Sequence, residues 1–169
     1  MVERYFEVLR ERGVHLERLE SIAEKLAQVL RPGDVVLLYG PLGAGKTTFV
    51  RAVARHLGVL DGVRSPSFTI ANIYSGPVVV QHLDLYRIDD IGDEDALALE
   101  EYGRDDAVTF VEWPEAGAGR LPAPAWVVTF AHETLETREV CVEACSPGAA
   151  GRWASAQGAS SACDDRAGA

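Results

Sequence analysis

The sequence has little of several features that mark particular classes of protein. It contains three cysteines, Cys141, Cys145 and Cys163. This number is odd and too small for a disulfide framework, and the spacing does not match a zinc site. No apolar run approaches the ~18 residues that a membrane span requires. The chain is charged from Glu3 onward, which argues against a secretion signal. We therefore expect a cytoplasmic protein without a membrane segment.

Basic residues are also scarce. The chain has 16 Lys and Arg against 26 Asp and Glu, and its net charge is -10. Binding to nucleic acid depends on basic side chains that neutralise phosphates, so any role on RNA is expected to require a partner. Acidic residues are most frequent between Asp89 and Asp106, which indicates either a solvated surface or a docking face for a basic protein.

The length and the distribution of residue types predict the domain organisation. A chain of 169 residues is expected to form one domain, which we place at residues 1–145. The structure of the segment 1–20 stays open. Residues 146–169 consist mainly of Ala, Gly and Ser, a composition that predicts a disordered tail because it offers little apolar surface to bury.

Patterns of apolar residues predict strands interleaved with helices. A capping box formed by Ser21 and Glu24 predicts a helix that begins at Ser21 and ends before Pro32. Because the later strands are joined by short connections, some of them are expected to pair antiparallel. The sequence thus predicts an α/β fold, a phosphate-loop NTPase-type sandwich with a mixed β-sheet. The other expected elements are strands at 35–39, 68–74, 78–83, 108–111, 126–130 and 138–142, and helices at 47–57 and 96–102.

The strongest functional signal is the glycine-rich segment GPLGAGKT, from Gly40 to Thr47. It matches the phosphate-loop pattern G-x-x-x-x-G-K-[S/T] at every specified position and lies between an expected strand and an expected helix. In such a loop the backbone N–H groups and the helix N-terminus converge on phosphate oxygens. Lys46 would then contact the β- and γ-phosphates, and the Thr47 hydroxyl would bind Mg2+. The expected nucleotide contacts are Gly40, Leu42, Gly43, Ala44, Gly45, Lys46, Thr47 and Thr48.

Side chains that would complete such a site follow two predicted strands. Asp84 and Glu112 each stand at the end of a strand, where carboxylates bind Mg2+ or orient water, although either could be a helix cap or a surface acid. Ser67 lies where a hydroxyl can sense the γ-phosphate, or in an ordinary turn. His82 shares a strand face with Asp84, and a single histidine of this kind is more often packed than a ligand. The chain has no Asn-Lys-x-Asp segment, so we expect ATP rather than GTP.

Together these segments resemble the TsaE family, a family of bacterial ATPases required to make threonylcarbamoyladenosine next to the tRNA anticodon. The resemblance extends from about Ser21 to Val142 and comprises, in chain order, the phosphate loop, VRSPSFT at 63–69, HLDLYR at 82–87, LEEY at 99–102 and VEWPE at 111–115. Position 67 is Ser where the family usually has Thr, and position 41 is Pro where Asp is common.

The resemblance implies a magnesium-dependent ATPase that is weak alone and works with the proteins TsaD and TsaB. It would reach tRNA only indirectly, through that complex. By motif position Lys46, Asp84 and Glu112 carry over as catalytic residues, and Thr47, Asp84 and Glu112 as metal ligands. Trp113 carries over as a cofactor contact beside Glu112.

Two other functions remain open from the residues alone. A small-molecule kinase shares the phosphate loop and the size, but it generally needs a cationic lid. Between Trp113 and Thr137 the chain offers only Arg120 as a Lys or Arg side chain. A nucleotide-gated binding module, in which ATP controls docking and hydrolysis is incidental, is the second alternative.

Overall fold

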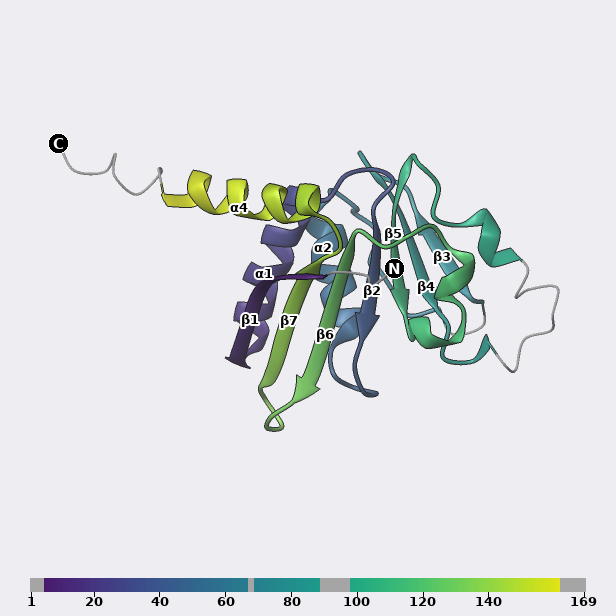
Figure 1. The fold of residues 1–169 in the computed structure, drawn as a ribbon. Coiled ribbons are helices and arrows are strands. Elements are labelled where there is room, and N and C mark those ends of the chain that lie inside the picture. Colours follow the sequence, from purple (N-terminus) through teal and green to yellow (C-terminus); the bar gives the residue numbers. More distant parts are fainter. Residues whose placement is uncertain (1–4, 67–68, 89–97, 162–169) are drawn as a thin grey trace.

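The computed structural model describes residues 5–66, 69–88 and 98–161. Within these residues a seven-stranded sheet has the order β1-β7-β6-β2-β5-β4-β3 (Figure 1). The strands are β1 (Phe6–Val14), β2 (Val35–Tyr39), β3 (Ala71–Tyr74), β4 (Val79–Asp84), β5 (Ala107–Glu112), β6 (Trp126–His132) and β7 (Arg138–Ala144). The helices are α1 (Leu16–Val29), α2 (Lys46–His56) and α4 (Pro147–Ser161), with the short 3-10 turns η2 (Ala98–Glu101), η3 (Pro114–Ala116) and η4 (Ala118–Arg120).

The sheet is mixed, as the sequence predicts. Its middle is parallel, because β2 pairs in parallel with β5 and β6, and β4 pairs in parallel with β5. Its two sides are antiparallel, because β3 pairs with β4, β7 with β6 and β1 with β7. Parallel strands end at the same edge of a sheet, so β2, β4 and β5 bring the residues that follow them close together.

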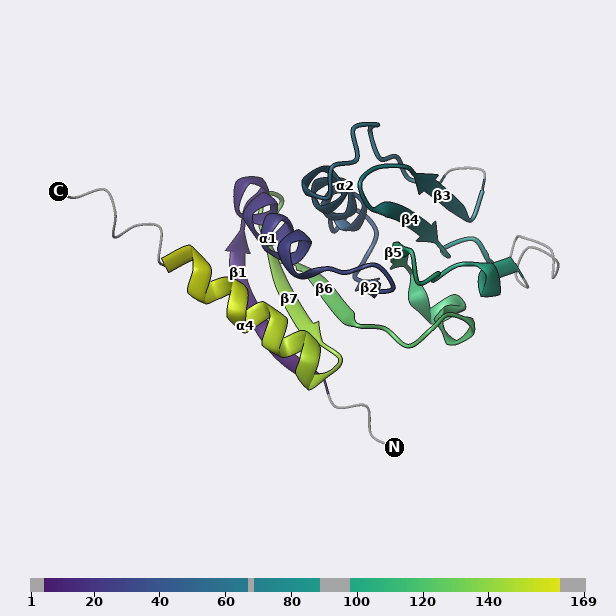
Figure 2. The same ribbon diagram turned by 90° about the horizontal axis from the view of Figure 1, so that it is seen from above.

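Strand β2 explains how the core is divided into two layers. Its side chains alternate across the sheet: Val36 and Leu38 pack in one hydrophobic cluster, and Val35 and Leu37 pack in the other. The first cluster contains the buried faces of α1, α2 and α4. Figure 2 shows α1 and α2 on the same side of the sheet. The second cluster is closed by shorter segments that include η2, so the sheet is buried on both faces at its centre.

The N-terminal half of the first helix differs from the prediction. Helix α1 begins at Leu16, and the hydroxyl of Ser21 donates to the carbonyl oxygen of Glu17 inside the helix, at 3.3 Å, in place of capping it. The predicted start at Ser21 is therefore wrong. The apolar stripe already includes Leu19, which is buried against the sheet, and this packing extends the helix by one and a half turns. The preceding residues form β1, an edge strand paired with β7.

The C-terminal segment is a helix where its composition predicts disorder. Helix α4 covers Pro147–Ser161, so the predicted disordered tail is wrong for these residues; 162–169 lie outside the described residues. Its anchor is Trp153, which is 2% exposed and lies with its ring centroid 6.1 Å from that of Trp126. One large buried ring offsets the low apolar content of the rest of the segment.

Charged groups hold the same helix in place. The guanidinium of Arg152 donates to both carboxylate oxygens of Asp34, at 2.8 and 3.1 Å, and to the carbonyl oxygen of Val29. Both side chains of this ion pair are largely buried.

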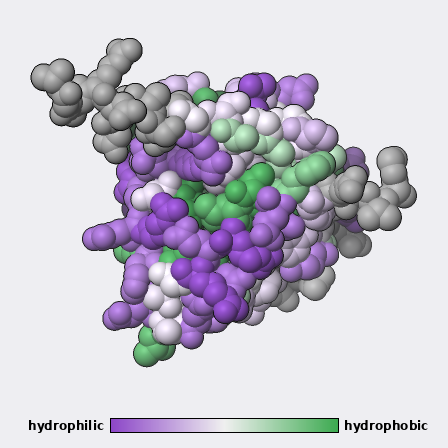
Figure 3. Space-filling model, turned by 60° about the vertical axis from the view of Figure 1, so that its left-hand side comes forward, coloured by the Kyte–Doolittle hydropathy of each residue, from purple (hydrophilic) through white to green (hydrophobic). Residues whose placement is uncertain are grey.

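On the side of the molecule that Figure 3 brings forward, an apolar area is bordered by hydrophilic residues. No helix in the described part of the chain is long and apolar enough to cross a membrane.

The remaining predicted elements agree with the structure to within a few residues. The strand predicted at 68–74 is shorter, Ala71–Tyr74, and 67–68 lie outside the described residues. The helix predicted at 96–102 is the 3-10 turn Ala98–Glu101, with 96–97 again outside them. The helix predicted at 47–57 begins one residue earlier, at Lys46.

Candidate nucleotide-binding site

The glycine-rich loop connects β2 to α2, as the sequence predicts. Gly40 has a φ of 146°, and a Cβ there would stand 2.8 Å from the carbonyl oxygen of Phe130, so only glycine lets the loop leave β2 at this place. Gly45 is the N-cap of α2 with a φ of 102°, again in the region that favours glycine. The loop therefore ends where the unpaired N–H groups of a helix begin, an arrangement that suits an anion.

Lys46 turns back over its own loop. Its Nζ donates to the carbonyl oxygens of Gly40 and Pro41, at 2.6 and 3.0 Å, and lies 4.1 Å from the centroid of the Trp113 ring. The residue is 4% exposed. Burial lowers the pKa of Lys46, while the nearby carboxylates of Glu112 and Asp84 act in the opposite direction. The ammonium is thus held in a partly desolvated place, where its attraction for a phosphate is stronger than in water.

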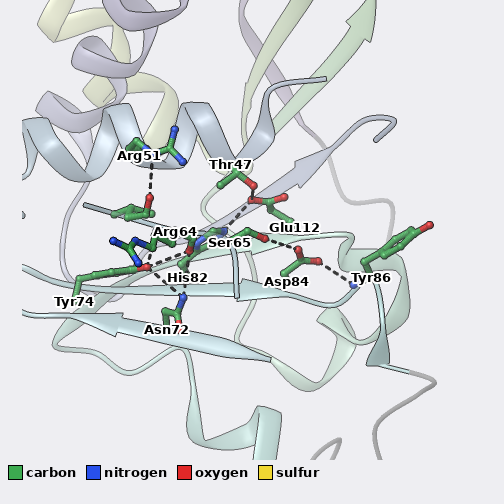
Figure 4. Close-up of polar contacts among 11 residues, drawn as sticks. Thr47, Arg51, Arg64, Ser65, Asn72, Tyr74, His82, Asp84, Tyr86 and Glu112 are labelled. Atoms are coloured by element: carbon green, nitrogen blue, oxygen red, sulfur yellow. Dashed lines mark hydrogen bonds and ion pairs between the residues drawn. The ribbon is translucent and has the colours of Figure 1, made fainter. Parts of the chain in front are cut away.

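The two predicted acids lie side by side. Strands β4 and β5 pair in parallel with Asp84 opposite Glu112, so both carboxylates stand at the edge of the sheet from which the phosphate loop leaves. The hydroxyl of Thr47 donates to Oε1 of Glu112 at 2.7 Å. Asp84 accepts from the backbone N–H of Tyr86 at 3.0 Å and from the hydroxyl of Ser65 at 3.3 Å (Figure 4). Both acids end their strands, as the sequence predicts, and their roles toward metal and water stay predictions.

Sequence reasoning missed the part played by His82. Its ring is completely buried, and its Nε2 lies 2.8 Å from Oε1 of Glu112. The signal was the spacing of two: His82 and Asp84 face the same side of β4, and the parallel register sets them beside Phe110 and Glu112 of β5. In this register His82 and Glu112 lie on the same face of the sheet, where the two side chains meet.

Trp113 combines an aromatic contact with an unusual backbone. Its φ of 55° makes it the sole non-glycine residue with positive φ among the described residues, and a bulky side chain in this region carries strain. The ring contacts the ring of Tyr86, with centroids 4.8 Å apart, and covers Lys46. The contacts that hold this ring beside the phosphate loop therefore offset the backbone strain at Trp113.

One pocket brings most of the predicted site residues together. Ser65 and Tyr86 belong to it too, although sequence reasoning assigned neither of them to the site. Gly40 and Ala44 lie in the loop but do not line the pocket, and Ser67 lies outside the described residues. The residues that line it are Leu42, Gly43, Gly45, Lys46, Thr47, Thr48, Ser65, Asp84, Tyr86, Glu112 and Trp113.

The donors in this pocket suit a hard cation that is shared with phosphate. Thr47, Asp84 and Glu112 offer oxygen atoms, the ligands that Mg2+ prefers. In the described part of the chain no group of three or more His, Cys, Asp or Glu side chains could hold a metal ion. A site with few protein oxygens fits Mg2+ that arrives with a nucleotide, because phosphates and water then supply the remaining ligands.

Comparisons with known proteins identify relatives of this chain in sequence and in fold. The family model of the threonylcarbamoyl adenosine biosynthesis protein TsaE matches residues 14–140. The tRNA threonylcarbamoyladenosine biosynthesis protein TsaE of Bacillus subtilis is 37% identical over 133 residues, which are 78% of this chain and 83% of the relative. Its namesake in Streptomyces coelicolor is 34% identical over 142 residues, 82% of this chain and 95% of the relative. The crystal structure of Bacillus subtilis YdiB has a TM-score of 0.73 and 31% sequence identity, covering 95% of this chain and 98% of that one.

Proposed function

The chain belongs to the TsaE family of tRNA threonylcarbamoyladenosine biosynthesis, and we propose that within this process it is an ATPase that binds ATP together with Mg2+. The observation that carries the proposal is the hydrogen bond from Thr47 to Glu112 at the base of a complete phosphate loop. In phosphate-loop enzymes this threonine faces the metal and the strand-end acid lies behind it. The same pair is assembled here from α2 and β5.

Each side chain has a role that follows from its contacts. The N–H groups at the start of α2 hold the phosphates, and Lys46 exchanges its two loop carbonyls for phosphate oxygens. The Thr47 hydroxyl donates its hydrogen to Glu112, so the lone pairs of the hydroxyl oxygen are directed away from the acid. Asp84 and Glu112 are then placed to orient water. When bound, Mg2+ supplies positive charge that offsets the charge on the phosphates.

We also propose that TsaD and TsaB are the partners and that they accelerate turnover. No arginine is among the described residues that line the pocket. Stabilising the charge on the transferred phosphate commonly uses an arginine, which a partner can supply. A protein with a net charge of -10 is also expected to reach tRNA through partners and not by itself.

Calorimetry and a turnover assay test this function. We expect the chain to bind ATP more tightly with Mg2+ than without it, and to release phosphate slowly alone and faster with TsaD and TsaB. Lys46→Met serves as the matched variant without the loop cation. Failure to bind ATP under any of these conditions would refute the proposal. Transfer of phosphate to a metabolite would favour a kinase, and tight binding without partner-dependent hydrolysis would favour a nucleotide-gated binding module.

A further inference from the structure

His82 connects three elements through a single oxygen atom. Its Nε2 lies 2.8 Å from Oε1 of Glu112, and the same oxygen accepts the hydroxyl proton of Thr47 at 2.7 Å (Figure 4). His82 is 0% exposed and Glu112 is 3% exposed. Strand β4, strand β5 and helix α2 therefore meet at this carboxylate, which also lines the pocket.

The surroundings of the ring define where its proton is. Nδ1 of His82 is buried and has no hydrogen-bond partner among the described residues. A proton on Nδ1 would be a buried donor without an acceptor, and a bare Nε2 would face the carboxylate lone pairs of Glu112. The arrangement that leaves no repulsion at Glu112 has a proton on Nε2, which donates to Oε1 of Glu112.

This contact limits how Glu112 can turn. With two donors on Oε1, the carboxylate is fixed at one end, while no described residue donates to Oε2. Lys46 lines the same pocket, so a carboxylate without this anchor could rotate and pair with the ammonium. In such a pair Lys46 would be less available to bind phosphate, and Glu112 would be less available to bind the metal.

We propose that His82 is a positioning residue that fixes Glu112 so that its Oε2 faces the pocket where Mg2+ and its water ligands are bound. The proposal rests on the proposed function, because it assigns a role within that magnesium site. His82 itself touches neither nucleotide nor metal. Its effect is transmitted by one hydrogen bond, as is usual for the groups that orient metal-ligating carboxylates.

Two variants at this position separate the hydrogen bond from packing. His82→Leu removes the donor, whereas His82→Gln can place an amide N–H close to the position of Nε2. Thr109→Val is the matched control: Thr109 lies on β5, is completely buried and donates to Gln81 of β4 at 2.8 Å, on the opposite face of the sheet. It removes a comparable buried hydrogen bond between the same two strands without touching Glu112.

The measurement is nucleotide binding and turnover as a function of Mg2+ concentration. We expect His82→Leu to raise the Mg2+ concentration for half-maximal turnover by about 10-fold or more, the size of effect typical of groups that orient metal ligands. ADP affinity in EDTA should stay within about 2-fold, because His82 lies outside the phosphate loop.

His82→Gln should restore most of the Mg2+ response, and Thr109→Val should leave it unchanged. An unchanged Mg2+ response in folded His82→Leu, or a His82→Gln variant as impaired as His82→Leu, would overturn the positioning role.

A measurement on the unmodified chain keeps the proposal testable if these variants do not fold. Nitrogen-15 NMR of the histidine rings should show a proton on Nε2 of His82. A ring with its proton on Nδ1 alone would overturn the proposal, because Nε2 could not then donate to Glu112. If the unmodified chain bound no ATP with Mg2+, the proposed function itself would fail. Normal binding with an unchanged His82→Leu variant would remove only the inference about His82.

Discussion

The ammonium of Lys46 lies 4.1 Å from the centre of the Trp113 ring while it donates to two carbonyl oxygens of its own loop. A buried cation needs such partners, since an unpaired charge in this place would be costly. The ring and the carbonyls are weaker partners than a phosphate, which bears formal negative charge. Lys46 is therefore held in position without a direct ion pair to a carboxylate of the described residues, and it can exchange these contacts for phosphate oxygens.

Replacing this lysine should weaken nucleotide binding directly. Lys46→Met keeps most of the side-chain volume and removes the charge, so we expect the loss of one charge-assisted contact, about 1.5 to 3 kcal/mol, seen as a 10- to 150-fold weaker ATP affinity by calorimetry. The control is Lys25→Met, which removes the only other lysine, one whose Nζ lies over the Trp153 ring and not in the pocket. Equal ATP affinities of the two variants would contradict the role assigned to Lys46.

Glu112 should matter more for turnover than for binding. In Glu112→Gln the amide oxygen can still accept from Thr47, but the negative charge that orients water is lost. We expect ATP affinity to remain within about 3-fold and turnover with the partners to fall by about 100-fold or more. The matched control is Glu115→Gln, because the charge of Glu115 also raises the pKa of Lys46 but this side chain is exposed. If both variants turned over ATP equally, Glu112 would not be the catalytic acid.

The part of the site that the sequence predicts is the part set by short segments. The phosphate loop is a contiguous pattern, and the positions of Asp84 and Glu112 follow because both end parallel strands. His82 and Trp113 need more than that. The contact of His82 depends on the register of two strands, and the left-handed backbone of Trp113 has no signature in residue type.

The fold shows the same division between local and distant information. Strand β2 is recognisable because its five residues form a continuous apolar run. The start of α1 and the whole of α4 depend on contacts between segments far apart in the chain. Trp153 of α4 packs against Trp126 of β6, and a composition rich in Ala, Gly and Ser does not indicate that contact.

Helix α4 should contribute to stability but not to nucleotide binding. Trp153 is almost completely buried, so Trp153→Ala is expected to lower the free energy of unfolding by about 3 to 5 kcal/mol, measured by urea or thermal denaturation. ATP affinity should not change, because the residues lining the pocket come from other elements. Ala154→Ser, on the exposed side of the same helix, is the control and should leave stability within about 0.5 kcal/mol. A Trp153→Ala variant as stable as this control would show that α4 does not anchor the domain.

Cys141 should be an unreactive thiol at ordinary pH. Burial raises its pKa to about 11, although Arg10 acts in the opposite direction, so at pH 8 only about 0.1% of it is the reactive thiolate. In a Cys145→Ser, Cys163→Ser background, alkylation by iodoacetamide at pH 8 is expected to be about 100-fold slower in the folded chain than in urea. Because the unfolded state has the lower pKa, it loses this proton first. Stability relative to Cys141→Ala should therefore be constant below about pH 8 and fall as the pH rises toward 11. Equally fast alkylation of the folded and unfolded chains would show that the thiol is accessible and its pKa ordinary.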